Sequence, residues 1–535
     1  MNVVHDGEVG GFRELPSLFE SEKSNSHANN IVSAYIGLFE DTPQHSILNL
    51  LGLIDRAVYL SELRPICAMR ELANLTAELE SYTLAQWKYA LHSLQKSKLI
   101  TLEKIGDDHS IDCHPLVRDF LINKLKSHES QVWTNGNRLL FKFLLGIASE
   151  QPESLTDLEP LFRAVIHGSR ASMYREAFDI YFHRIRSSQF SIYTLGSHHS
   201  DRECLRSFFN KEWTEPVEEL QPEEKFYVLS CAATNLIYLG DINSAIEPAY
   251  SSIEWFYSQK MWDEALSVGG PTLSMLITIG KLDEAQLLIE KLSESVDKTK
   301  NKLLQSGAYA FQGFVYFLKN EVEKAEELFD YSEKYLAQIQ PLSEVNFPIV
   351  SSFFVRFLLE TGQIKRAWER FLMTFEWREK GAWQVKFDTT SLYASDLLFH
   401  GFIASKLGDD ETAASCLDQQ VELLRNANEW LHLPAGLNYR AKFYIENGLL
   451  TDAARDLQES LSISERTGAR FEQWESFLNY AYLHLKREKP NMVTRYLNKA
   501  AKLEGMNMYK FRDREIAELE SKLSDLKLRK KRYGR

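Results

Sequence analysis

The sequence predicts an all-α protein in which most of the chain forms an α-solenoid of paired helices, preceded by a smaller module. Three observations lead to this prediction. A Gly-x-x-x-x-Ala step returns about every 40 residues in the second half of the chain, which is the scale of a helix-pair repeat. Glycine and proline are sparse, at 25 and 14 of 535 residues, and this disfavours a turn-dense β architecture. Hydrophobic residues make up 44% and charged residues 26%, which is an ordinary globular composition.

The front of the chain predicts a linker or extension over residues 1–43 and a winged-helix domain over residues 44–130. Helices are expected at Ser46–Ile54 and Leu63–Leu72. Thr83 and Gln86 form a capping-box pattern that opens a third helix, Leu84–Ser97. Two short β-prone segments follow, on either side of a polar turn at residues 106–109. Three helices and then a β-ribbon is the order of a winged helix-turn-helix.

Residues within this module resemble a known family. Leu51–Arg56 and the run Cys113-His114-Pro115-Leu116-Val117-Arg118 look like the winged-helix domain of NB-ARC-type signal-transducing ATPases of the STAND class. In that family a histidine at the position of His114 touches bound ADP, but the acidic residue that follows it there is Pro115 here. The resemblance implies a signalling role, which in bacteria includes transcriptional control and defence against phage.

The nucleotide-binding part of such an ATPase has no counterpart in the sequence. A P-loop needs Gly-x-x-x-x-Gly-Lys-Ser/Thr, and no such string occurs. We therefore expect no cofactor, and His114 would contact a nucleotide only if an ATPase module is supplied in cis or in trans. The chain would then be the carboxy-terminal part of a longer protein, one subunit of a split system, or a descendant that has lost nucleotide chemistry.

Residues 131–221 predict a helical connector. Tyr174–Ala177 is an isolated step of the helix-pair kind, and it is also similar to bacterial STAND proteins with repeat tails. His198-His199-x-Asp201 has no third residue at a ligand spacing, so we interpret it as a surface loop and expect no metal site. No motif of a hydrolase or metalloprotease occurs, and we expect neither catalytic residues nor an enzyme.

The repeats predict the solenoid over residues 222–510. Two antiparallel helices approach closely where a small residue lies at their crossing, and the residue four positions later shares that face. Glycine before the second helix supplies the positive φ of a tight turn. The copies are Gly240/Ala245, Gly280/Ala285, Asn320/Ala325, Gly362/Ala367, Gly408/Ala413, Gly448/Ala453 and a weaker last one at Arg487/Met492.

This pattern resembles the tetratricopeptide repeat. The resemblance implies a right-handed α-solenoid of helix pairs that binds a protein or peptide on its concave wall, which the first helix of each pair lines. The lysine and asparagine pattern of chaperone-tail-binding members is not reproduced, so no peptide carboxylate is inferred from it. Setting the register by the alanines places five residues on that wall: Phe314, Arg356, Phe402, Asn438 and Lys442.

Residues 511–535 predict a C-terminal helix with a basic tail. Lys527–Arg535 contains six basic residues in nine, which we interpret as a solvated helix end, with contact to nucleic acid or to an acidic partner as the alternative. The formal charge of −13 argues against binding nucleic acid through the overall field, and DNA is not the expected partner. Lys88 and His92 lie on the third helix of the front module and could face a DNA groove, so a transcription regulator is an alternative hypothesis. A plain assembly scaffold is a third hypothesis.

The cysteines indicate the compartment. No two of them form a CxxC pair, so we expect buried, reduced thiols in a cytoplasmic protein. No apolar segment resembles a signal peptide or a membrane span, and no membrane contact is expected. The five are Cys67, Cys113, Cys204, Cys231 and Cys416.

Overall fold

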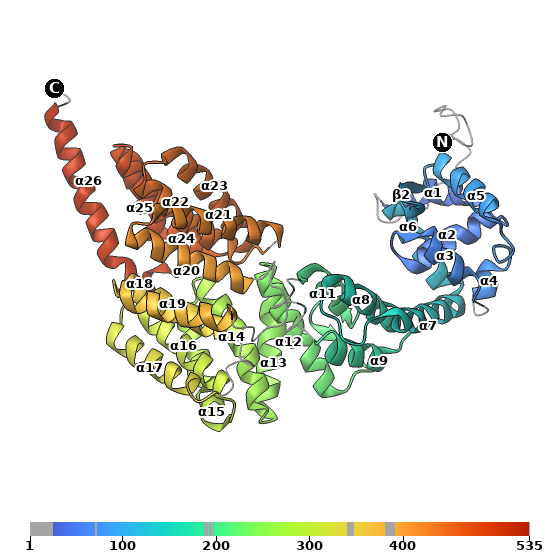
Figure 1. Cartoon of the computed structure of the whole chain (residues 1–535), viewed down its shortest axis with the longest axis horizontal. Helices are drawn as coiled ribbons and strands as arrows, with labels where there is room; N and C mark the ends of the chain where they lie inside the picture. The colour runs from blue at the N-terminus through green and yellow to red at the C-terminus, as the bar shows by residue number, and fades with distance from the viewer. Residues whose placement is uncertain are drawn as a thin grey trace. The chain divides into compact units, whose positions relative to one another are not determined.

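The computed structural model describes residues 25–69, 72–186, 191, 195, 197–339, 347–379, 391–427 and 429–533 (Figure 1). The chain divides into two compact units. Unit 1 comprises Met1–Glu150 with Glu159–Tyr181, and unit 2 comprises Gln151–Leu158 with Phe182–Arg535. No helix of the described part of the chain is both long and apolar enough to cross a membrane.

Unit 1 begins with helices and a small sheet. The sheet has the strand order β1-β3-β2 and is antiparallel throughout, with Val58 and Leu102 both paired to Ile111. The capping box expected at Thr83 is formed: the Gln86 amide oxygen accepts the Thr83 backbone N–H at 2.9 Å. The elements are α1 (Asn25–Gly37), α2 (Pro43–Ile54), β1 (Val58–Tyr59), α3 (Leu60–Cys67), α4 (Ala73–Thr76), α5 (Leu84–Lys96), β2 (Ile100–Ile105) and β3 (Asp108–Cys113).

The core of unit 1 lies around α2. Every residue from Ile47 to Ile54 is buried, and Trp87 of α5 packs into the same cluster. Gly52 allows close packing there, since a β-carbon at its position would lie 2.7 Å from the β-carbon of Leu121. The remaining helices are α6 (Pro115–His128), α7 (Ser130–Ile147), α8 (Leu155–Arg170), whose first turn belongs to unit 2, and α9 (Tyr174–Asp179). The π-helical turn η3 (Ile180–Arg184) follows, and unit 2 resumes within it, at Phe182.

Unit 2 opens with α11 (His198–Arg206) and a short hairpin of β4 (Phe209–Lys211) and β5 (Glu215–Pro216). The surface loop expected at His198 was wrong, because this residue begins α11 and is buried, as is Asp201. The His198 ring stacks on that of Tyr238 in α12 (Pro222–Tyr238), with centroids 5.7 Å apart, and the His198 carbonyl accepts the Asn235 side-chain amide at 2.9 Å, so contacts with the first helix pair bury this residue.

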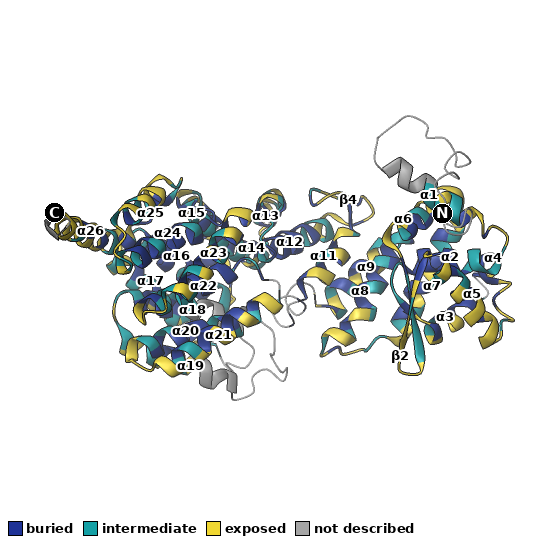
Figure 2. Ribbon diagram, turned by 90° about the horizontal axis from the view of Figure 1, so that it is seen from above, coloured by how far each residue is buried: buried dark blue, intermediate teal, exposed yellow. Residues whose placement is uncertain are grey.

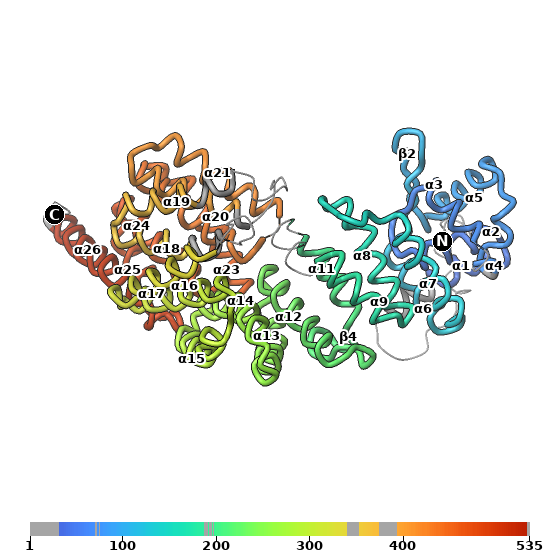
Figure 3. Tube along the Cα trace, turned by 60° about the horizontal axis from the view of Figure 1, so that its bottom comes forward, coloured from blue at the N-terminus to red at the C-terminus, as the bar shows by residue number. Residues whose placement is uncertain are grey.

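The α-solenoid predicted from the repeat is confirmed (Figures 1 and 3). Each pair of antiparallel helices follows the previous one along the chain, from α12 to α25. The pairs are α12 (Pro222–Tyr238) with α13 (Ile242–Ser258), α14 (Trp262–Thr278) with α15 (Leu282–Lys298), α16 (Lys302–Leu318) with α17 (Val322–Leu336), α18 (Phe347–Glu360) with α19 (Ile364–Glu379), α20 (Ser391–Leu407) with α21 (Asp410–Asn426), α22 (Leu433–Glu446) with α23 (Leu450–Thr467), and α24 (Arg470–Lys486) with α25 (Pro490–Lys502).

The turns within the pairs have the conformation that the sequence predicted. Gly240 has φ +75°, and the Asp241 N–H reaches back to the Leu236 carbonyl at 2.9 Å, which closes the helix end. Asn320 takes the same position with φ +65°. The alanines at the crossings are fully buried, in line with the dark-blue faces of the helices in Figure 2.

The last copy is an exception to the predicted register. Glu488 has φ +52°, and Val493 is the fully buried residue five positions later. The assignment of this step to Arg487 and Met492 was therefore wrong by one residue. Neither glycine nor alanine marks this copy, so no residue in the sequence fixes its register.

A C-terminal segment closes the array of unit 2. It comprises η5 (Met506–Met508), η6 (Lys510–Arg512) and α26 (Asp513–Tyr533). The Tyr509 hydroxyl donates to the Ile277 carbonyl at the end of α14, at 2.5 Å. Leu519 and Leu523 of α26 pack against α24 and α25, and the far end of α26 projects from the helix pairs (Figure 1).

Candidate functional site

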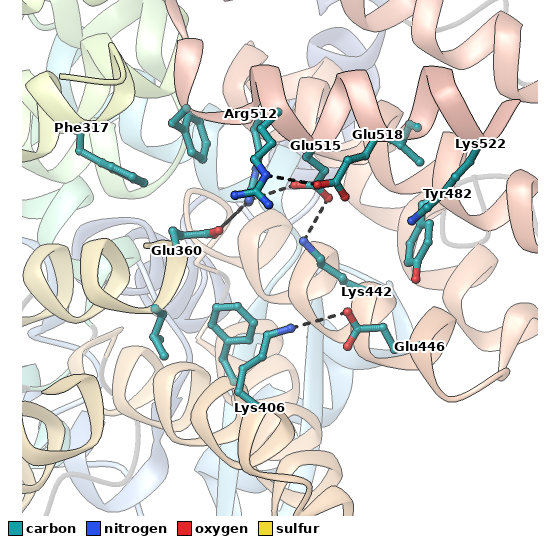
Figure 4. Close-up of a pocket in the computed structure, with 15 residues that line it drawn as sticks. Phe317, Glu360, Lys406, Lys442, Glu446, Tyr482, Arg512, Glu515, Glu518 and Lys522 are labelled. Atoms are coloured by element: carbon teal, nitrogen blue, oxygen red, sulfur yellow. Dashed lines mark hydrogen bonds and ion pairs between the residues drawn. The ribbon is translucent and has the colours of Figure 1, made fainter. Parts of the chain in front are cut away.

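A cavity of about 420 Å³ lies in unit 2 against the first helices of consecutive pairs (Figure 4). One side is formed by the C-terminal ends of α16, α18, α20, α22 and α24, and the other by η6 and α26. The helix pairs contribute Phe317, Leu359, Glu360, Phe402, Lys406, Lys442, Glu446 and Tyr482. The C-terminal segment contributes Phe511, Arg512, Arg514, Glu515, Glu518, Leu519 and Lys522.

The repeat register explains why these side chains share one wall. Phe402 lies six residues before the turn residue Gly408, and Lys442 lies six before Gly448. Lys406 and Glu446 each follow four residues later, and residues at i and i+4 share a helix face. We call the stripe formed by these two positions on the first helices the inner wall.

The five residues placed on this wall from the sequence have different surroundings. Phe402 and Lys442 line the cavity. Phe314 is buried and packs on the ring of Phe353, with centroids 4.7 Å apart. Asn438 is buried and donates to the backbone and side-chain oxygens of Glu472, both at 3.0 Å, so it joins α22 to α24.

Arg356, the fifth of these residues, has an unusual environment. Its guanidinium lies 5.5 Å from the ring centroid of Phe314, 5.8 Å from that of Tyr439 and 5.2 Å from that of Phe471. Its side chain is half-buried, and its Nε is buried without a hydrogen-bond partner. Within the described residues it forms no hydrogen bond and no ion pair.

A buried ionic cluster forms the base of the cavity. Arg512 donates to both carboxylate oxygens of Glu360, at 2.7 and 2.9 Å, and to Glu475 at 3.1 Å. Their side chains are only 7%, 9% and 11% exposed, respectively. Burial by itself would raise the pKa of Glu360, but the Arg512 guanidinium outweighs burial and lowers that pKa to about 2. Glu360 and Arg512 are therefore both charged at neutral pH.

The charges at the rim are more exposed than this cluster. Lys442 lies 3.2 Å from Glu515, which also lies 3.1 Å from Arg512, and Lys406 lies 3.7 Å from Glu446. Lys522 has no ion-pair partner among the residues that the structure describes. Because exposed pairs of this kind contribute about 0–1 kcal/mol, a bound group can exchange with them at little cost.

Sequence reasoning missed the contribution of the C-terminal segment. Arg512 follows the last helix pair, and no repeat register extends to it. A signal was present in the aromatic residues Tyr509 and Phe511, which are out of place on a solvated linker. The Phe511 ring lies 5.2 Å from that of Phe317 in the third helix pair.

His114 lies in unit 1, at the amino terminus of α6. Its Nδ1 accepts the backbone N–H of Leu116 at 3.3 Å, so the imidazole caps the helix. The side chain is exposed, and its other ring nitrogen is available to a partner. In the described part of both units, no group of three or more histidine, cysteine, aspartate or glutamate side chains is arranged to hold a metal ion.

Comparison with known proteins adds two similar structures. No family model matches the sequence, and no curated protein is significantly similar to it. A signal transduction ATPase of the STAND class with a tetratricopeptide repeat sensor, from Pyrococcus horikoshii, aligns with a TM-score of 0.37 and 14% identity over 95% of this chain and 68% of that one. A Rap protein complexed with competence and sporulation factor aligns with a TM-score of 0.40 and 10% identity over 82% of this chain and 99% of that one. Such values assign neither a family nor a function.

Proposed function

We propose that this chain is a non-enzymatic sensor of a STAND-type signalling system and that its repeat array recognises a protein or peptide ligand. The observation that carries the proposal is the cavity on the inner wall, to which five consecutive first helices and α26 contribute. Its volume of about 420 Å³ lies within the range of about 300–1,000 Å³ typical of ligand pockets. Such a cavity admits a few residues of an extended segment and excludes a folded domain.

The lining suits a peptide. Aromatic rings of Phe402 and Tyr482 offer apolar contact, and the more exposed charges at the rim offer exchangeable polar contacts. A plain scaffold would need no such cavity, which favours a sensor over that reading.

The test is a peptide selection on the immobilised full chain. Random hexapeptides are retained by the wild type and by two variants, the cavity variant Phe402→Ala/Lys442→Ala and the control Arg455→Ala. Arg455 is 73% exposed on a second helix and does not line the cavity. We expect enrichment on the wild type and the control and its loss on the cavity variant. Equal retention by all three, or no enriched sequence on the wild type, would refute the proposal.

The resemblance of the front module supports the second half of the proposal. The winged-helix domain would relay occupancy of the array to a nucleotide-binding module, in cis or in trans, and a ligand that prefers one arrangement of the array would shift the equilibrium. His114 is the residue to test. When the chain is reconstituted with such a module, His114→Ala should change the rate at which the complex releases ADP. An unchanged rate would exclude this role for His114.

A second candidate function rests on α5. Lys88, Tyr89, His92, Lys96 and Lys98 are all exposed in this region, and Tyr89 is 76% exposed. A helix of this kind could enter a DNA groove, as in winged-helix transcription regulators. A gel-shift with genomic fragments at two salt concentrations separates the candidates, since specific retention with a steep salt dependence favours DNA.

A further inference from the structure

We infer that the ligand of the inner wall carries a carboxylate and that Arg356 binds it. This inference rests on the proposed function and names the ligand class of the same wall. Arg356 lies four residues before Glu360 on α18, so the two share a helix face, and Glu360 lines the cavity. It also occupies, relative to Gly362, the position that Phe402 and Lys442 occupy relative to their own turn glycines.

The arginines nearby show what is missing at Arg356. Arg512 donates hydrogen bonds to Glu360 and Glu475. Arg440 donates to Asp456 through both Nε and Nη2, at 2.7 and 2.8 Å. Arg356 holds no carboxylate of the described residues. Its Nε is buried without a hydrogen-bond partner, and an unsatisfied buried donor costs free energy.

The aromatic rings around Arg356 do not meet this need. A guanidinium stacks on rings through its faces, whereas its five N–H donors point outward in its plane. Contacts with Phe314, Tyr439 and Phe471 therefore fix the group and leave its donors unused. A carboxylate is the planar acceptor that fits two such donors side by side.

The neighbouring acids are committed elsewhere. Glu360 and Glu475 bind Arg512. Glu472 accepts a hydrogen bond from Asn438 at 3.0 Å and forms none with Arg356. Arg356 carries a single positive charge, which matches a monoanion better than a phosphate dianion. The carboxylate can come from an acidic side chain or from a peptide C-terminus.

Three hexapeptide libraries distinguish these sources. The first is capped at both ends, the second has a free C-terminal carboxylate, and the third is capped and contains one phosphoserine. Each is retained on the immobilised full chain, as wild type, Arg356→Gln, Arg356→Lys and the exposed control Arg455→Gln. Arg356→Lys keeps the charge but loses the planar pair of donors, and it guards against a variant that simply fails to fold.

We expect aspartate or glutamate at a fixed position in the first library, or enrichment in the second only, on the wild type and the control. Individual selected peptides should bind Arg356→Gln about 10- to 100-fold more weakly than the wild type, because a charge-assisted pair of hydrogen bonds is lost. Their affinity for Arg356→Lys should be intermediate. Enrichment in the capped library without a preference for aspartate or glutamate, a preference for either kind of carboxylate that survives in Arg356→Gln, or enrichment of phosphoserine alone would each overturn the inference. Peptides that are enriched without a carboxylate preference, and whose binding is lost in Phe402→Ala/Lys442→Ala, would leave the proposed function standing. No enrichment on the wild type would remove both.

Discussion

Arg512 and Glu360 form a bidentate ion pair, at 2.7 and 2.9 Å, across 152 residues of sequence. The pair fastens the C-terminal segment to α18, and Glu475 of α24 joins it at 3.1 Å. One side of the cavity therefore belongs to the repeats and the other to α26. A ligand that fills the cavity would contact both sides, and we expect its affinity to depend on how α26 is held.

The first prediction concerns Arg512. Arg512→Ala leaves Glu360 and Glu475 buried without their partner, and breaking a buried pair in this way costs about 3–5 kcal/mol. We expect the unfolding transition of the repeat array to move to lower denaturant by a corresponding amount, measured by far-UV circular dichroism. Retention of peptides by the cavity should fall as well.

Arg514 is the matched control for this substitution. It lies two residues away on α26 and also lines the cavity, but its side chain is 93% exposed. Arg514→Ala should change stability by no more than about 0.5 kcal/mol. If both variants lose the same stability, burial of the ionic cluster is not what holds the segment.

The second prediction concerns pH. The pKa of Glu360 is lowered from 4.5 to about 2 by Arg512, against the effect of burial. The folded state thus binds fewer protons than the unfolded state, so the contribution of Glu360 is fully present above its unfolded pKa and is lost as pH falls through its folded pKa. The stability difference between wild type and Glu360→Gln should be constant at neutral pH and shrink between pH 4.5 and about 2. A difference that does not change over this range would contradict the assigned cause.

The repeat could be predicted because a few residues fix it locally. Glycine at 240, 280, 362, 408 and 448 supplies the positive φ of one turn, and the alanine five positions later is buried at one helix crossing, so the pattern can be recognised within a few residues of sequence. The prediction failed where that chemistry is absent. At Glu488 a non-glycine residue takes the positive φ, and at His198 a histidine is buried by packing against the first repeat, which no local pattern indicates.

The candidate site could be predicted only in part, for a related reason. The register placed Phe402 and Lys442 on the inner wall, and both line the cavity. It could not separate them from Asn438, whose hydrogen bonds to Glu472 are seen only in three dimensions. Arg512 was beyond reach, because its partners lie 152 and 37 residues away. That these wall residues bind a ligand stays a prediction.

The third prediction concerns the thiols. All five cysteines are free and buried, and burial raises the pKa of Cys67 and of Cys113 to about 12. The thiolate is the reactive form, and it is scarce at pH 8 for such groups. A chromogenic thiol reagent should therefore react slowly with the folded chain and label all five cysteines once guanidinium chloride is added. Rapid labelling of Cys67 or Cys113 in the folded chain, identified by mass spectrometry, would contradict their buried environment.

The fourth prediction separates backbone conformation from packing in the turns. Gly448 has φ +77°, and a β-carbon at its position would meet no atom within 4 Å. Any cost of a side chain there comes from the left-handed backbone conformation, which for an ordinary L-residue is about 1–2 kcal/mol. Asparagine enters this conformation more readily than alanine, and Asn320 already occupies the equivalent turn. Gly448→Ala should therefore lower the free energy of unfolding by about 1–2 kcal/mol and Gly448→Asn by clearly less. Equal losses of unfolding free energy in the two variants would mean that the positive φ is not the reason for glycine at this turn, nor at the equivalent turns of the other helix pairs.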